Sequence, residues 1–119
     1  MFKKIEINNV HTKVDKETKD FINNKIGKLD TYVSSHSRES AHVEVFIKEA
    51  NSSKKTYICE VWIHLPHQDI FVKENGQTIF SAVDVCENRL KIQLKKYKDK
   101  NETGKYKRRL FARFSKKVG

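Results

Sequence analysis

Apolar and polar residues alternate along four segments of the chain, which is the spacing of strands with one buried face. The first segment is short and contains Ile5 and Ile7. The others read AHVEVFIKE (41–49), KTYICEVWIHL (55–65) and DIFVKE (69–74). These three are joined by the short turns ANSSK and PHQ, so we predict that they form an antiparallel meander.

Two further segments have the spacing of helices, with apolar residues every three or four positions. Asp15 can cap the first helix, from about residue 16 to 33, whose apolar stripe is Ile22, Ile26, Leu29 and Val33. Thr78 can cap the second, whose stripe is Ile79, Val83, Cys86, Leu90, Leu94 and Tyr97. The polar segment SSHSRES (34–40) lacks such a stripe, and we predict a loop there.

The resulting order, β-α-β-β-β-α, predicts an α+β fold in which two helices pack on one face of a four-stranded, mostly antiparallel sheet. We assign this domain to residues 1–100. The remaining segment, NETGKYKRRLFARFSKKVG (101–119), has neither spacing and is rich in cations and aromatic residues. Its apolar content is too small to fold alone, so we expect a basic C-terminal tail that is flexible in the free protein.

Positive charge is concentrated at the C-terminal end of the chain. The net charge is +10, yet residues 1–88 hold 12 Lys and Arg against 13 Asp and Glu, whereas residues 89–119 hold 13 against 2. Solubility alone does not require such asymmetry, whereas a polyanionic partner would select for it, because clustered cations neutralise phosphates and release their counterions. Nucleic acid is therefore the leading partner, and an anionic membrane surface is the second.

The second predicted helix carries its cations on both sides of the apolar stripe, so it can pack on the sheet and still present charge to a partner. Lys91, Lys95 and Lys98 lie on one side, and Arg89 and Lys96 on the other.

On the first predicted helix, two cations flank the stripe. In the tail, cations alternate with aromatic residues, which favours RNA because cations bind phosphates while aromatic and Arg planes stack on bases. These additional candidate residues are Lys25 and Lys28 in the helix and Lys105, Lys107, Arg108, Arg109 and Arg113 in the tail. Three apolar tail residues share one helical face, Tyr106, Leu110 and Phe114, so binding to anionic lipid is a competing use of the tail.

The sequence does not predict a catalytic or metal site. The five histidines are scattered, without metal-ligand spacing or a neighbouring pair of carboxylates. They are His11, His36, His42, His64 and His67. The strand phase makes His42 and His64 possible neighbours, which we interpret as ordinary surface histidines. We therefore expect no enzymatic activity, cofactor, metal or small-molecule substrate.

The two cysteines and the N-terminal segment bear on the cellular compartment. Cys59 and Cys86 match no metal or redox spacing, and we predict that they are small buried hydrophobic residues. The chain has no apolar run of signal-peptide or membrane-span length, which is roughly 20 residues for a span. We therefore expect a cytoplasmic protein, for which binding to a membrane is the weaker hypothesis.

Three stretches resemble the ribosome hibernation-promoting factors, also called ribosome-associated inhibitors. They read KVDKETKDFINNKIGKLDTY (13–32), VWIHLP (61–66) and IFSAVDVCENRLKIQLKKYKDK (79–100). The last is the most specific, because it combines an Ala-Val-Asp helix start with the basic ending QLKKYKDK. The resemblance extends over about residues 1–100.

The resemblance implies a β-α-β-β-β-α fold and a defined partner, the small ribosomal subunit with its rRNA and ribosomal proteins. Such a protein binds in the channel that tRNA and mRNA otherwise use, and it inhibits translation by occupancy. The rRNA-binding positions implied by the match are Lys25, Lys28, Arg89, Lys95, Lys96, Lys98 and Lys100. Lys91 is an additional cation on the same helix, and Ile92 stands where the family usually has a basic residue.

Two questions stay open in the sequence. The chain ends before the separate dimerisation domain of the family's long form would begin, so we expect the short form, which can favour either paired or single inactive ribosomes. The alternative function is that of an independent double-stranded-RNA-binding module. Such modules have a similar α-β-β-β-α order, but they place a loop and a helix N-terminus on the duplex grooves.

Overall fold

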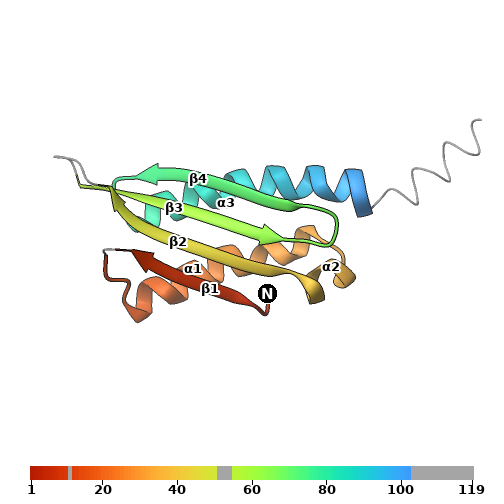
Figure 1. Ribbon diagram of the computed structural model, residues 1–119, viewed down its shortest axis with the longest axis horizontal. Coiled ribbons are helices and arrows are strands. Elements are labelled where there is room, and N and C mark those ends of the chain that lie inside the picture. The colour runs from red at the N-terminus through yellow and green to blue at the C-terminus, as the bar shows by residue number, and fades with distance from the viewer. Residues whose placement is uncertain (11, 51–54, 103–119) are drawn as a thin grey trace, which may run out of the picture.

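The structure of the protein is a computed structural model that describes residues 1–10, 12–50 and 55–102 (Figure 1). It contains four strands, three α-helices and two shorter helical segments among these residues. In chain order they are β1 (Ile5–Val10), α1 (Lys16–Gly27), the 3-10 helix η1 (Lys28–Tyr32), α2 (Ser35–Ser40), β2 (His42–Ala50), β3 (Thr56–His64), β4 (Asp69–Gly76), α3 (Ile79–Tyr97) and the π-helical turn η2 (Lys98–Glu102).

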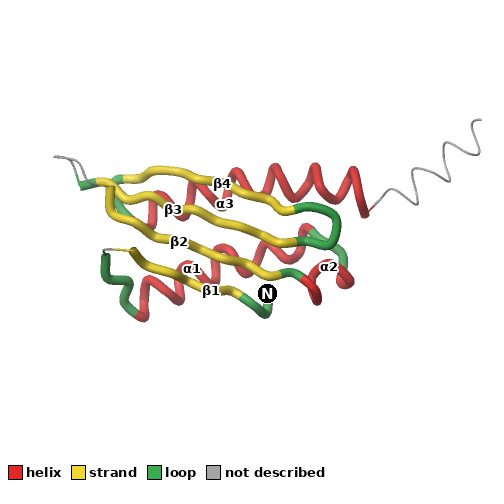
Figure 2. The backbone as a smooth tube through the Cα atoms, viewed as in Figure 1, coloured by secondary structure: helices red, strands yellow, loops and turns green. Residues whose placement is uncertain are grey.

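The strands form one mixed sheet with the order β1-β2-β3-β4. Strand β1 pairs with β2 in parallel, whereas β2 with β3 and β3 with β4 are antiparallel. Helices α1 and α3 lie on the same face of the sheet, and no helix among the described residues covers the other face (Figure 2). This arrangement confirms the predicted α+β fold and the predicted meander of the last three strands.

The core lies between the sheet and the two long helices. Val45 and Val61 in the central strands, Ile26 on α1 and Leu90 on α3 are all fully buried. Alternate residues of each strand point to this side because the side-chain period of a strand is two. The apolar stripes predicted for the two helices are therefore the surfaces by which they pack on the sheet.

The two cysteines are part of this core, as predicted. Cys59 and Cys86 are free and completely buried, and the Cys86 thiol donates a 3.3 Å hydrogen bond to the Cys59 carbonyl oxygen. Contact with the Cys86 thiol and burial both raise the pKa of the Cys59 thiol. A thiol with a raised pKa forms little of the reactive thiolate, so this pair is suited to packing.

Helix α3 begins at a tight junction with β4. The Thr78 hydroxyl accepts a hydrogen bond from the Ser81 backbone N–H, and the Ser81 hydroxyl accepts one from the Thr78 N–H, which makes a capping box. Gly76 sits against the first turn, where an added Cβ would lie 2.5 Å from the Ala82 backbone nitrogen. The absence of a side chain at Gly76 is what lets β4 and α3 approach this closely.

Two local predictions were wrong. The helix expected over residues 16–33 ends at Gly27, whose carbonyl accepts a 3.1 Å hydrogen bond from the Phe2 N–H, and the chain continues as the 3-10 helix η1. The segment expected to be a loop contains α2. Its start is capped by the Ser34 hydroxyl, which accepts from the Ser37 N–H at 3.3 Å. Local capping and the burial of Ser37 stabilise this short helix without an apolar stripe.

At its C-terminal end, α3 continues directly into η2. The Asn101 side-chain amide donates a 3.2 Å hydrogen bond to the Tyr97 carbonyl oxygen, one turn earlier. The proposed domain boundary at residue 100 thus falls within a helical turn that runs to Glu102. Residues 103–119, most of the predicted tail, lie outside the described residues.

Candidate nucleic-acid interface

Helices α1 and α3 lie side by side, and together with η1 and η2 they form a surface that we call the helix layer. The Phe21 and Phe80 rings meet edge to face with 4.8 Å between their centroids. Beside them, the Lys25 Nζ atom lies 3.7 Å from Asp84 Oδ1. Because these contacts join the two helices, cations that are far apart in the sequence share one surface.

The side of α3 that faces α1 and η1 carries two of the predicted cations. The Lys91 Nζ atom lies 3.8 Å from Glu87 Oε1, one turn earlier on the same helix. Further along, the Lys95 Nζ atom lies 5.6 Å from the centre of the Tyr32 ring on η1, within the range of a cation-π contact. Lys95 has no carboxylate contact among the described residues, so its charge is not neutralised by an anion.

The opposite side of α3 faces β4. There the Arg89 Nη1 atom lies 2.6 Å from Glu74 Oε1, and the arginine side chain remains 59% exposed. About two turns further along, Lys96 is exposed and makes no ion pair within the described part of the chain. The structure thus confirms that cations occupy both sides of the apolar stripe.

The positive charge of the helix layer increases toward the C-terminal end of α3. In the first half of the helix, Asp84 and Glu87 contact Lys25 and Lys91, and Glu74 contacts Arg89. The second half and the adjoining segments present exposed cations at Lys28, Lys95, Lys96, Lys98 and Lys100. Exposed ammonium groups can bind phosphates and release their counterions without a preformed cavity.

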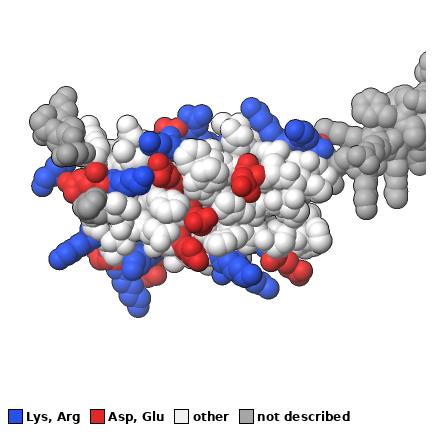
Figure 3. Space-filling view, viewed as in Figure 1, with Lys and Arg blue, Asp and Glu red and all other residues white. Residues whose placement is uncertain are grey.

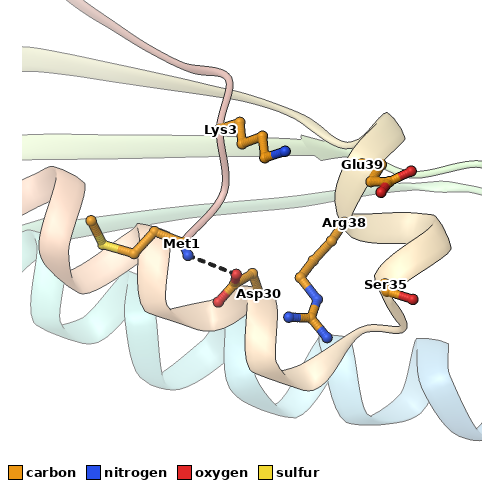
Figure 4. Close-up of a pocket in the computed structure, with 6 residues that line it drawn as sticks. All are labelled: Met1, Lys3, Asp30, Ser35, Arg38 and Glu39. Atoms are coloured by element: carbon orange, nitrogen blue, oxygen red, sulfur yellow. Dashed lines mark ion pairs between the residues drawn. The ribbon is translucent and has the colours of Figure 1, made fainter.

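The sequence predictions missed the carboxylates that partner the cations and a second basic location. A shallow pocket of about 260 Å³ lies where the N-terminal segment meets η1 and α2 (Figure 4). Its floor is the buried Asp30, whose Oδ2 atom lies 2.8 Å from the Met1 ammonium nitrogen. Lys3 and Arg38 extend into the space beside this pair. Arg38 was overlooked because its segment has no periodic pattern.

The remaining predicted site residues are the tail cations Lys105, Lys107, Arg108, Arg109 and Arg113, and they lie outside the described residues. Within the described ranges, no group of three or more His, Cys, Asp and Glu side chains is arranged to hold a metal ion. No helix among those residues has the length and apolar character needed to cross a membrane.

The chain is similar to a known protein family, to a curated protein and to solved structures. Residues 5–102 match the family described as Sigma 54 modulation protein / S30EA ribosomal protein. The ribosome hibernation promotion factor of Staphylococcus aureus (strain COL) is 30% identical over 95 residues, which are 80% of this chain and 48% of that protein. The chain therefore spans about half the length of this curated relative.

Two solved structures share the fold. The N-terminal domain of Protein Y from Thermus thermophilus superposes with a TM-score of 0.67 at 21% identity, over 77% of this chain and 94% of that one. A ribosomal subunit interface protein from Coxiella burnetii superposes with a TM-score of 0.64 at 18% identity, over 80% and 97%. The family match over most of the residues confirms the resemblance inferred from the sequence, and the chain belongs to the Sigma 54 modulation protein / S30EA ribosomal protein family.

Proposed function

We propose that this chain is a non-enzymatic ribosome hibernation factor. Its helix layer binds rRNA of the small ribosomal subunit in the channel that tRNA and mRNA use, and translation stops because the channel is occupied. The observation that carries the proposal is the set of exposed cations at the C-terminal end of α3, which lies beside η1 on a single surface. The printed names of the relatives, a ribosome hibernation promotion factor and a ribosomal subunit interface protein, support the choice of partner.

The residues proposed to bind rRNA are those of the helix layer. Lys95, Lys96 and Lys28 have no carboxylate contact within the described residues, so they can meet phosphates without first breaking an ion pair. Lys25, Lys91 and Arg89 have to exchange an exposed ion pair, which contributes only about 0–1 kcal/mol, for a phosphate contact. Lys98 and Lys100 extend the same surface along η2, and the tail cations are proposed to add contacts beyond it.

Inhibition by occupancy requires a rigid body and a binding surface but no reacting group. The fully buried core between sheet and helices supplies the rigid body. The cations supply affinity and attract the chain to the RNA by long-range electrostatics, an effect that salt screens. The proposed place of action is the cytoplasm, on ribosomes, with no small-molecule substrate or cofactor.

The distribution of charge also argues against the alternative of a double-stranded-RNA-binding module. Such a module places a helix N-terminus on the duplex. In this chain the N-terminal half of α3 carries the acidic residues Asp84 and Glu87, whereas Lys95 and Lys96, which have no carboxylate contact among the described residues, lie toward the opposite end. A long RNA duplex should therefore compete poorly with small subunits for binding.

Cosedimentation with isolated small ribosomal subunits tests the proposal. The substitutions Lys95→Ala, Lys96→Ala and Lys98→Ala, made together, should lower the affinity at least about tenfold at fixed salt, because three phosphate contacts are lost. The matched control replaces Lys4, Lys13 and Lys55, three exposed lysines outside the helix layer, and should lower it much less. Equal losses in both variants would show that net charge, and not this surface, determines binding. No cosedimentation of the wild-type chain would contradict the proposal itself.

A further inference from the structure

The face of the sheet that no helix covers has its own chemistry. The register places its outward side chains in rows across the strands. One row is Glu6, Glu44, Trp62 and Phe71, and the next toward the β3–β4 turn is His42, His64 and Asp69. Figure 3 views this open face and shows carboxylates among uncharged side chains over the strands.

Aromatic rings form the centre of these two rows. The Trp62 and Phe71 rings are in contact, with 4.4 Å between their centroids, and Phe71 is 41% exposed. On the other side, Trp62 lies nearly parallel to the His64 ring, with 6.0 Å between centroids and 8° between planes. A partly exposed Trp among further rings is a favourable surface for a planar or cationic group of a partner.

The carboxylates around the rings are only partly neutralised. Two lysines within the strands point to this face, Lys48 and Lys73, and both contact Glu60, with Nζ to carboxylate distances of 3.2 and 3.7 Å. Glu6 and Glu44 stand directly opposite each other in the β1–β2 register, an arrangement of like charges that is unfavourable in a sheet.

The carboxylates nearer the β3–β4 turn contact histidines. His64 lies between Glu44 and Asp69, with ring nitrogen to oxygen distances of 2.7 and 3.0 Å. His42 lies 3.7 Å from Glu6. The two strand lysines of this face are thus directed to Glu60, whereas the carboxylates Glu6, Glu44 and Asp69 have histidines as their ion-pair partners among the described residues.

We propose that this end of the open face binds an extended, arginine-rich segment of a partner protein. We call it the acidic aromatic patch, defined as Glu6, Glu44, Trp62, His64, Asp69 and Phe71. A guanidinium group can pair with a carboxylate through two parallel hydrogen bonds and can stack on a Trp ring, and both groups are adjacent in one row here. An RNA strand could also stack on the rings, but its phosphates would meet carboxylates, and so charge complementarity favours a basic polypeptide.

According to this proposal, the two faces of the molecule bind partners of opposite charge. The helix layer, with its exposed lysines, suits phosphates, and the acidic aromatic patch on the other side of the sheet suits cations. The two sites are separated by the core, so one partner can bind each face at the same time. The inference does not depend on the proposed role of the helix layer.

The chain contains a single tryptophan, so Trp62 reports directly on the patch. The probe is a synthetic peptide of alternating Arg and Gly, titrated into the full chain while the Trp emission is recorded. We expect a saturable change in emission that salt weakens. The substitutions Glu6→Gln and Glu44→Gln, made together, should weaken peptide binding about five- to tenfold, which is the effect expected for two exposed ion pairs.

Controls separate this site from the helix layer. Lys95→Ala with Lys96→Ala should leave peptide binding unchanged while weakening binding to small subunits, and the Glu6 and Glu44 variant should do the reverse. Both variants are first checked by circular dichroism to be folded under the titration conditions, because the loss of the Glu44 contact with His64 is itself expected to lower stability. The proposal is overturned if the peptide causes no saturable change, if the double Gln variant binds it as well as the wild type, or if single-stranded RNA without peptide changes the Trp emission as strongly as the peptide does.

Discussion

Lys25 on α1 and Asp84 on α3 form an ion pair across the two helices, with 3.7 Å between Nζ and Oδ1. Both side chains are about half exposed, so the pair itself contributes little to stability, about 0–1 kcal/mol. Its larger effect is on the helix layer, because Asp84 places a negative charge on the surface that we propose for rRNA and holds Lys25 in place. The carboxylate therefore limits the affinity of that surface.

Replacing Asp84 by Asn should tighten binding to isolated small subunits about two- to fivefold at low salt. The change removes an anion that repels phosphates and frees Lys25 to contact one, while the fold should lose at most about 1 kcal/mol. The control is Glu49→Gln, the same charge change at an exposed position near the end of β2, away from the helix layer. Equal tightening in both variants would indicate a general effect of net charge.

Stability should depend on pH through His64. Its ring nitrogens contact Glu44 on β2 and Asp69 on β4, and these hydrogen bonds, that to Glu44 above all, raise the pKa of the imidazole above its ordinary value. The neighbouring His42 ring, at 5.8 Å, belongs to the same cluster. Because the folded state holds the proton more tightly than the unfolded chain, the stabilisation is complete below about pH 6.5 and is lost as pH rises through the raised pKa.

The variant His64→Gln measures this contribution. Urea unfolding of wild type and variant should differ most near pH 6, and the difference should shrink steadily toward pH 9. Glu44→Gln, which removes the stronger acceptor, should show a weaker pH dependence than the wild type. A difference between wild type and His64→Gln that stays constant over this pH range would mean that the His64 charge does not stabilise the fold.

Inhibition by occupancy should be stoichiometric with ribosomes. In a purified translation system, less than one equivalent of protein should leave a proportionate fraction of ribosomes active, because each bound chain blocks one channel. The rRNA should remain intact. Complete inhibition by a trace of protein, or cleaved rRNA, would instead indicate catalytic turnover.

Removal of residues 104–119 tests the assignment of the tail. This segment holds seven Lys and Arg and no Asp or Glu, so its loss should weaken binding to small subunits and reduce the salt dependence. The described domain, whose last buried side chain is Tyr97, should remain folded by circular dichroism. Unfolding of the truncated chain would move the domain boundary, and unchanged affinity would assign the tail to another partner.

The strands and the position of α3 were predictable because burial on one face imposes a regular period on the sequence. The end of α1 was not, since it depends on a hydrogen bond between Gly27 and the distant Phe2. The sequence predicted which cations lie on the helix layer, but it did not predict the carboxylates that form ion pairs with them. Glu74 contacts Arg89 only because β4 packs beside α3. The two residues are far apart in the sequence, so no local pattern predicts their contact.

Ile92 offers the most direct test of the RNA-binding surface. It is 56% exposed on α3, with Lys91, Lys95 and Lys96 as near neighbours. Because the side chain is not in the core, Ile92→Lys should leave the unfolding midpoint almost unchanged. If the helix layer contacts rRNA, the added ammonium should gain a phosphate contact. The affinity for small subunits should then rise, and the slope of log K against log salt should steepen by roughly 0.7–0.9, the value for one contact.

Ile92→Gln, which removes the apolar side chain without adding charge, should leave the slope unchanged. A Lys variant with the wild-type slope would show that this part of α3 does not face phosphates in the complex, and the interface would have to be moved toward η1 and η2.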